Sequence, residues 1–234
     1  MGVEPPAWFM VWNSAGGTSF TGRTPTFFVE ESVDTEKKGP STETADDAAD
    51  KSPRWQIQIY TGNGKGKTTC ALGLSLRALG QGFKVAFVQF DKGYHGVEHY
   101  AERHVLRTLE GIDLFPTGCE RMTPGGKFRF GVTPDDLDEA RRGLEIVEDL
   151  IHHPRHQLVV LDEVLSAIPY HLIKEADALS ILDAYEEAGR PFELVLTGRK
   201  ASSTLIDRAD LVTEMVPVKH YFDRGLMARP GIEY

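Results

Sequence analysis

The sequence predicts an α/β fold in which helices cover both faces of a mainly parallel sheet. Stretches of strand length alternate along the chain with stretches of helical periodicity, which is typical of strand–helix–strand units. Several strand-like stretches, such as 85–90 and 158–162, are apolar at nearly every position, as expected for strands buried on both faces. With 234 residues, the chain has room for one such domain of about 180 residues and an additional segment.

The first strand and the first helix of this domain flank a glycine-rich turn. Residues 55–60 alternate between large apolar and polar side chains, which predicts a strand. Leucines recur at helical spacing over 69–79, which predicts a helix, and Cys70 is expected to be a core residue of that helix. The leucines concerned are Leu72, Leu76 and Leu79.

The remaining elements continue the alternation. An apolar run at 84–90 predicts a second strand that ends in a polar loop, and 135–152 has the periodicity of a long helix. The apolar face predicted for that helix consists of Leu137, Leu144, Val147 and Ile151. Further strands are predicted at 112–115, 157–163, 192–199 and 211–216, and further helices around 100–109, around 176–188 and just before the last strand.

The turn after the first strand has the composition of a phosphate-binding loop, Thr-Gly-Asn-Gly-Lys-Gly-Lys-Thr-Thr over 61–69. Glycines allow tight turns that bring backbone N–H groups close to phosphate oxygens, and the following helix adds the positive end of its dipole. In the general motif, Lys67 reaches the terminal phosphates and the Thr68 hydroxyl holds Mg²⁺. The first glycine of the motif is shifted, because Thr61 takes its place and Gly62 follows one residue late. The residues predicted to bind nucleotide here are Gly62, Asn63, Gly64, Lys65, Gly66, Lys67, Thr68 and Thr69.

Polar residues follow the other strands where ligands bind in parallel sheets, at the carboxyl ends. Asp162 and Glu163 end an apolar strand, and with Thr68 they are the predicted metal ligands, since Mg²⁺ prefers hard oxygen donors. The alternative is that the two carboxylates merely end the strand or cap the next helix. Gln89 ends another strand and is predicted to contact the nucleotide. Arg199 either clamps a phosphate with its planar guanidinium or forms a surface ion pair, and the sequence does not decide between these.

The first part of the chain differs from the rest in composition. Residues 1–50 contain nine acidic and three basic residues, a net charge of −6 out of −9 for the whole chain. The stretch 34–52 has almost no large apolar side chain, so burial cannot offset the entropy of ordering it. We therefore expect a largely disordered acidic extension over 1–52 and a nucleotide-binding domain over 53–234.

Composition also argues against some classes of partner and location. The chain is acidic and has no basic stripe that would neutralise nucleic-acid phosphates, so we expect no nucleic-acid partner. It has neither a secretory pattern nor an apolar run of membrane-spanning length, which favours a cytoplasmic protein without a membrane partner. Cys70 and Cys119 show no metal-binding spacing and suit a reduced compartment.

From about residue 56 to the end, the chain closely resembles the phosphate-loop type of ATP:corrinoid adenosyltransferase. The resemblance rests on the loop at 61–69, on Val88-Gln89-Phe90 with Lys92-Gly93, on Val159-Val160-Leu161-Asp162-Glu163, on Leu196-Thr197-Gly198-Arg199, and on the tail from Val218-Lys219-His220 to Gly231-Ile232-Glu233-Tyr234. Ordinary phosphate-loop kinases and ATPases share the loop but not the tail. The shifted first glycine is a trait of the resembled family.

The resemblance implies a RecA-like phosphate-loop fold and the transfer of an adenosyl group. In this family a corrinoid reduced to Co(I) attacks C5′ of ATP, and triphosphate leaves. ATP, Mg²⁺ and a corrinoid substrate are therefore implied, together with an electron-donating reductase and a homodimer. The loop would hold the triphosphate, while Lys65 and Lys67, with Arg199 as a third candidate, stabilise the charge that grows on it. Thr68, Asp162 and Glu163 would hold the metal.

Two positions depart from the family pattern on the corrinoid side. Thr117-Gly118 is followed by Cys119-Glu120-Arg121-Met122 instead of by aromatic residues, and no aromatic residue follows until Phe128. Asp91 supplies a carboxylate where an apolar residue is expected. The alternative functions are therefore a divergent nucleotide-binding protein or ATPase without corrinoid activity and, as a third hypothesis, a phosphoryl-transfer kinase.

Overall fold

The computed structural model describes residues 55–93, 98–121, 129 and 131–234. These residues form a six-stranded sheet in the order β3-β2-β4-β5-β1-β6, and every pairing in it is parallel. The strands are β1 Ile57–Thr61, β2 Val85–Gln89, β3 Ile112–Pro116, β4 Leu158–Asp162, β5 Glu193–Thr197 and β6 Leu211–Glu214. The predicted α/β class with a parallel sheet is confirmed. The predicted disordered extension over 1–52 lies outside the described residues.

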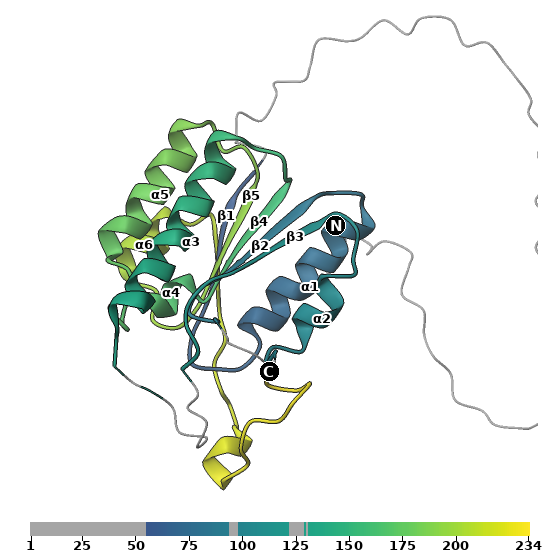
Figure 1. Ribbon diagram of the computed structural model, residues 1–234, viewed down its shortest axis with the longest axis vertical. Helices are drawn as coiled ribbons and strands as arrows, with labels where there is room; N and C mark the ends of the chain where they lie inside the picture. Colours follow the sequence, from purple (N-terminus) through teal and green to yellow (C-terminus); the bar gives the residue numbers. More distant parts are fainter. Residues whose placement is uncertain (1–54, 94–97, 122–128, 130) are drawn as a thin grey trace, which may run out of the picture. The chain divides into compact units, whose positions relative to one another are not determined.

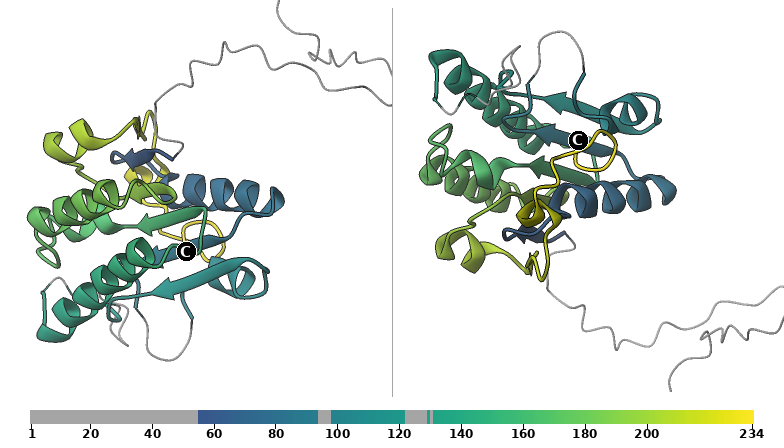
Figure 2. Two further views of the ribbon diagram at one scale, coloured as in Figure 1. Left: turned by 90° about the horizontal axis from the view of Figure 1, so that it is seen from above. Right: turned by 90° about the horizontal axis from the view of Figure 1, so that it is seen from below.

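Helices lie on both faces of the sheet, as Figures 1 and 2 show. One face carries α1 Lys67–Gly80 and α2 Glu102–Leu106, and the other carries α3 Pro134–His152, α4 Val164–Ala167, α5 Glu175–Glu187 and α6 Ser203–Arg208. A short 3₁₀ helix, η1 Tyr221–Arg224, lies in the C-terminal tail. None of the helices in the described part of the chain is both long and apolar enough to cross a bilayer.

Alternate residues of the strands form two separate apolar cores. Val85, Phe87 and Val160 belong to the core under α1, whereas Ala86 and Val88 point into the core under the other helices. Because successive side chains of a strand point to opposite faces, a strand buried on both faces must be apolar at nearly every position. This explains the continuous apolar runs in the sequence.

The prediction that Cys70 is a core residue of α1 is wrong. Leu76 is 56% exposed and Cys70 is exposed, whereas Ala71 and Ser75 are fully buried against the sheet. Small side chains let the helix axis approach the strands closely, so the leucines flank the contact instead of forming its centre. The helix also begins two residues earlier than predicted, at Lys67.

The buried face of α3 is also partly different from the prediction. Val147 and Ile151 are buried as expected, but Leu137 is 40% exposed. Gly143 takes part in the contact instead, because a Cβ atom at this position would lie 2.7 Å from the Phe90 ring. A glycine therefore brings α3 onto the end of β2, and the helix face is rotated away from Leu137.

Candidate active site

The predicted functional residues meet at the carboxyl-terminal end of the sheet, where β1, β2, β4 and β5 end. The strand registers place Gln89 beside Asp162 and Tyr60 beside Thr197, so these ends are aligned across the sheet. Figure 1 shows α1 starting at the same end of the sheet, with the C-terminal tail close by. The site is therefore built from segments that lie more than a hundred residues apart in the chain.

The loop after β1 needs its glycines because the end of β6 passes directly against it. Gly62 and Gly66 have φ angles of 96° and 122°, in the left-handed region that favours glycine. The Gly64 N–H donates to the Met215 carbonyl oxygen over 2.6 Å, and a Cβ at Gly64 would lie 2.7 Å from that oxygen. Thr61 is still a strand residue, and its Oγ1 accepts a hydrogen bond from the Ala201 N–H at 3.2 Å. The shifted glycine thus begins the loop where the strand ends.

Lys67 lies inside the loop. Its Nζ donates to the carbonyl oxygens of Gly62 at 3.0 Å and Gly64 at 2.8 Å, and the side chain is buried. Burial lowers the pKa of the Lys67 ammonium, the charge of Arg199 lowers it further, and Glu163 opposes the shift. The amine is therefore held where phosphate oxygens would provide better partners than neutral carbonyls.

The end of β4 provides a carboxylate that is held on several sides. The fully buried Asp162 accepts hydrogen bonds at Oδ1 from the hydroxyl groups of Thr68 at 2.9 Å and Thr197 at 2.7 Å. The structure thus brings together two of the three predicted metal ligands. Their oxygens are of the hard type that suits Mg²⁺. No group of three or more His, Cys, Asp or Glu side chains among the described residues has the arrangement of a metal site, so any Mg²⁺ here would need oxygens from the nucleotide and water as well.

Glu163, the third predicted ligand, adopts a left-handed conformation with φ 63° and precedes α4. Its carboxylate accepts a hydrogen bond from the Ser166 hydroxyl, and the Ser166 Oγ in turn accepts one from the Arg199 N–H at 2.9 Å. A Cβ at Gly198 would lie 2.5 Å from the Ser166 backbone nitrogen, which explains the glycine before Arg199. Arg199 is exposed, and its charge lowers the pKa of the Lys67 ammonium; contact of the Arg199 side chain with a phosphate stays a prediction.

Two predicted nucleotide-binding residues have protein partners in this structure. Gln89 is fully buried, and its amide donates to Glu102 at 3.2 Å and accepts from Arg103 Nε at 2.6 Å. Lys65 is exposed, and its Nζ donates to the Ile232 carbonyl oxygen of the C-terminal tail at 2.6 Å. Direct contact of either side chain with a nucleotide stays a prediction.

Sequence reasoning placed Lys92 in a segment of the family resemblance but gave its side chain no role in the site. Its buried Nζ lies 2.6 Å from Asp162 Oδ2 and 3.5 Å from Thr68 Oγ1. Burial alone would lower the pKa of the Lys92 ammonium, but the charges of Asp162 and Glu163 together raise it above its usual value. The position of Lys92 in the sequence could have indicated such a role, since it follows a buried strand at the carboxyl-terminal end of the sheet, where the ligand-binding groups lie.

The two residues that depart from the family pattern contact each other. Arg121 Nε lies 2.5 Å from Asp91 Oδ1, and the two side chains are only 6% and 14% exposed. Burial raises the pKa of the Asp91 carboxyl group, and the hydrogen bond and charge of Arg121 oppose that shift. One departure therefore compensates for the other. Met122 and Phe128 of the same loop lie outside the described residues.

The loops after β2 and β3 are tightly joined next to this pair. Lys92 N–H donates to the Thr117 carbonyl oxygen at 2.9 Å, and a Cβ at Gly93 would lie 1.6 Å from the Gly118 carbonyl oxygen. A hollow of about 390 Å³ opens beside this junction. Its lining includes Gly93, Gly118, Cys119, Glu139 and Arg142.

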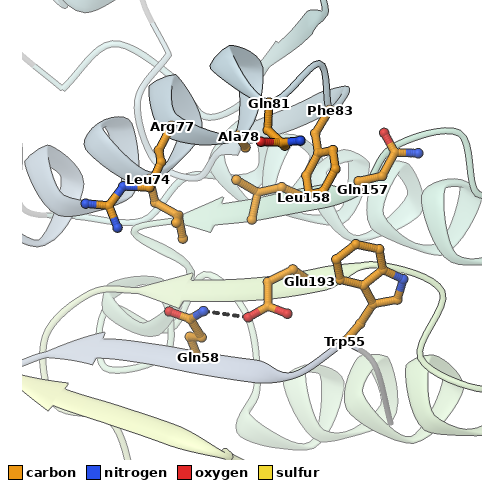
Figure 3. Close-up of a pocket in the computed structure, with 10 residues that line it drawn as sticks. All are labelled: Trp55, Gln58, Leu74, Arg77, Ala78, Gln81, Phe83, Gln157, Leu158 and Glu193. Atoms are coloured by element: carbon orange, nitrogen blue, oxygen red, sulfur yellow. Dashed lines mark hydrogen bonds between the residues drawn. The ribbon is translucent and has the colours of Figure 1, made fainter. Parts of the chain in front are cut away.

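A second hollow, of about 340 Å³, lies at the opposite end of the sheet, where the strands begin (Figure 3). Trp55 and Phe83 meet edge to face there with ring centroids 5.9 Å apart. Glu193 lies in the same hollow, and its carboxylate already accepts hydrogen bonds from the Gln56 N–H and the Gln58 amide. Because β4 and β5 begin at this end of the sheet, the hollow is separated from the phosphate loop by the length of the strands.

Comparison with known proteins assigns this chain to a family. Residues 54–234 match the model of the ATP:corrinoid adenosyltransferases BtuR/CobO/CobP. The chain belongs to this family. The corrinoid adenosyltransferase of Sinorhizobium sp. is 36% identical over 76% of this chain and 79% of its own length. Corrinoid adenosyltransferase CobA of Salmonella typhimurium is 34% identical over 76% of this chain and 85% of its own length.

A protein of Pseudomonas aeruginosa, also named corrinoid adenosyltransferase, is 34% identical over 79% of this chain and 86% of its own length. Among solved structures, that of the RadB recombinase aligns with 68% of this chain and 72% of its own, with a TM-score of 0.41 and 20% sequence identity. The predicted family is therefore confirmed by the match over 54–234.

Proposed function

We propose that this protein transfers the 5′-deoxyadenosyl group of ATP to the Co(I) centre of a reduced corrinoid and releases triphosphate, in the biosynthesis or salvage of adenosylcobalamin. The observation that carries the proposal is a site suited to a triphosphate at the carboxyl-terminal end of the sheet, in a chain that belongs to this family. In the reaction the cobalt lone pair forms a bond to C5′. The C5′–O5′ bond breaks, and its electron pair leaves with the triphosphate.

The phosphate loop holds the leaving group in this proposal. The Gly64 N–H is already bonded to Met215, so the other N–H groups between Gly62 and Thr69 would donate to the phosphates, and the start of α1 adds a positive dipole end. Lys67, with Arg199 close enough to influence it, stabilises the negative charge that grows on the triphosphate as the bond breaks. Lys65 joins them if it leaves the Ile232 carbonyl oxygen.

The metal position fits Mg²⁺ by the chemistry of its donors. Thr68 Oγ1 and the Asp162 carboxylate lie within one hydrogen bond of each other, and Glu163 follows Asp162 directly. When bound, Mg²⁺ supplies positive charge that neutralises the phosphate oxygens. Thr197 keeps Asp162 oriented through its hydroxyl group.

No protein nucleophile is required for this transfer, because the corrinoid carries the difficult chemistry. The protein contributes orientation: it fixes the triphosphate so that C5′ faces the approaching cobalt. Such positioning can lower a barrier by about 7–11 kcal/mol. We further propose that the protein works as a homodimer in the cytoplasm and that a separate reductase supplies Co(I). The free thiols of Cys70 and Cys119 suit a reducing compartment.

A second candidate function is a divergent ATPase that keeps the nucleotide and has lost the corrinoid. The observation that favours it is the Asp91–Arg121 ion pair, which takes the place of the expected apolar and aromatic groups. A phosphoryl-transfer kinase is the third hypothesis.

The nucleotide product separates these functions. Incubation with ATP, Mg²⁺ and reduced cobalamin, followed by ion chromatography, should yield intact triphosphate in the amount of corrinoid consumed. ADP and inorganic phosphate, with or without cobalamin, would support the ATPase and contradict the transferase. ADP together with a phosphorylated acceptor would support a kinase.

A further inference from the structure

An ammonium group lies at the position that the proposed function gives to the metal ion. Lys92 Nζ contacts Asp162 Oδ2 at 2.6 Å and lies 3.5 Å from Thr68 Oγ1. Thr68 Oγ1 itself donates to the other carboxylate oxygen of Asp162 at 2.9 Å. The cation therefore sits between the same two oxygen-bearing side chains that suit Mg²⁺.

The protein fixes the backbone of Lys92 from two sides. The guanidinium group of the fully buried Arg103 donates to the Lys92 carbonyl oxygen, and its Nε donates to Gln89 at 2.6 Å. The Lys92 N–H donates to the Thr117 carbonyl oxygen at 2.9 Å. The Tyr100 ring centroid lies 5.2 Å from Lys92 Nζ, which gives the cation an aromatic face as well. These backbone contacts leave the flexible side-chain stem of Lys92 free to change its conformation.

Charge balance explains why an ammonium and a metal ion exclude each other here. The carboxylates of Asp162 and Glu163 act on both Lys67 and Lys92, Glu102 acts on Lys92, and Arg199 acts on Lys67, so three negative charges face three positive ones. Adding a divalent cation at hydrogen-bond distance from Lys92 would leave a large uncompensated positive charge in a partly desolvated site. A triphosphate brings several negative charges, and only then can both cations be accommodated.

We propose that Lys92 is the resident cation of this site: it holds the metal position while no nucleotide is bound and turns to the triphosphate oxygens when Mg²⁺ and ATP bind together. The inference rests on the proposed function for the identity of the metal position. Lys92 keeps Asp162 and Thr68 assembled in the free protein, makes metal binding depend on nucleotide, and becomes a further cation on the leaving triphosphate. A lysine suits this role because it is a compact charge on a flexible stem, unlike the planar arginine fork.

The test is the affinity of the nucleotide-free protein for Mn²⁺, measured by electron paramagnetic resonance of the free ion. We expect weak binding to the wild type and binding at least about tenfold tighter to Lys92→Met, because the competing charge is removed from the carboxylate. Lys84→Met is the matched control, since it removes the same charge from an exposed position at the other end of β2 and should behave as the wild type. Mn²⁺ alone should also raise the melting temperature of Lys92→Met and leave that of the wild type unchanged.

Lys92→Gln provides a second variant if Lys92→Met fails to fold, since its amide can still donate to Asp162. Equal Mn²⁺ affinity of the wild type and a folded Lys92 variant would overturn the proposal. An equal gain in Lys84→Met would also overturn it, because net charge alone would then explain the result. The titration contains no corrinoid, so a protein that shows the expected metal affinities but never alkylates Co(I) would refute the proposed transferase function separately from the role of Lys92.

Discussion

The phosphate side of the site and the side formed by the loops after β2 and β3 use charge in different ways. On the phosphate side, the hydrogen bonds that Lys67 Nζ makes within the described part of the chain all go to loop carbonyl oxygens, so its charge is available for a ligand. On the other side, Asp91 and Arg121 neutralise each other. The charge of Lys67 faces the phosphate loop and acts in the proposed reaction, whereas the Asp91–Arg121 pair mainly holds a loop in place.

Breaking the Asp91–Arg121 pair should have the largest effect on stability. Arg121→Met leaves a nearly buried carboxylate without its partner, so we expect the free energy of unfolding to fall by about 3–5 kcal/mol. The double variant Asp91→Leu/Arg121→Met removes both charges and should be much closer to the wild type. Urea denaturation of the two single variants and the double variant measures this coupling. Additive losses in the double variant would show that the pair is not a structural unit.

Removing Lys67 should instead affect turnover and leave stability nearly unchanged. Lys67→Met removes a cation aimed at the leaving group, so we expect kcat to fall about 100- to 1000-fold. The melting temperature should stay the same or rise, because among the described residues the buried ammonium is hydrogen-bonded to neutral carbonyl oxygens. Adenosylation assays and thermal melts measure the two quantities, with Lys84→Met as the control. Normal turnover in Lys67→Met would show that the loop lysine does not act on the leaving group.

The smallest expected effect concerns the start of α3, and it depends on pH. Asp136 accepts two hydrogen bonds from Arg129 at 2.6 and 2.8 Å and one from the Thr133 N–H, and the pKa of its carboxyl group lies well below the usual range. A lowered folded-state pKa adds stability above the unfolded pKa of about 3.9 and loses it as the pH falls. Asp136→Asn should therefore lower the free energy of unfolding by about 1–2 kcal/mol at pH 7. Urea titrations between pH 7 and pH 3 should show this difference shrinking, and a difference independent of pH would contradict the assignment.

Most of the fold could be predicted from the sequence because β2, β4 and β5 are nearly continuous apolar runs that end in polar residues, and β1 alternates between apolar and polar residues. The positions of the strands and of the long helices agree with the prediction to within a few residues. The four-residue helix α4 was missed, since one turn after the left-handed Glu163 has no periodicity to detect. The buried face of α1 was misjudged because Ala71 and Ser75 form the contact, and the more apolar Leu76 remains outside it.

The site was predictable where the chemistry lies within one short segment. The phosphate loop and the carboxylates after β4 are local patterns, and the structure brings Thr68 and Asp162 into contact. Lys92 and the Asp91–Arg121 pair depend on contacts between segments that are distant in sequence, so no spacing rule identifies them. In physical terms, composition at strand ends indicates where a ligand binds, but the pairing of charges becomes visible only in three dimensions.

The transferase function itself is tested most directly by the absorbance spectrum of Co(I) cobalamin, reduced chemically and mixed anaerobically with the wild-type protein, ATP and Mg²⁺. The Co(I) bands should disappear at a rate that depends on ATP, and a light-sensitive alkylcobalamin should form with one triphosphate for each cobalt–carbon bond. Persistence of the Co(I) spectrum, while ATP is shown to bind the same protein sample, would contradict adenosyl transfer and leave the loop as a nucleotide site of another function.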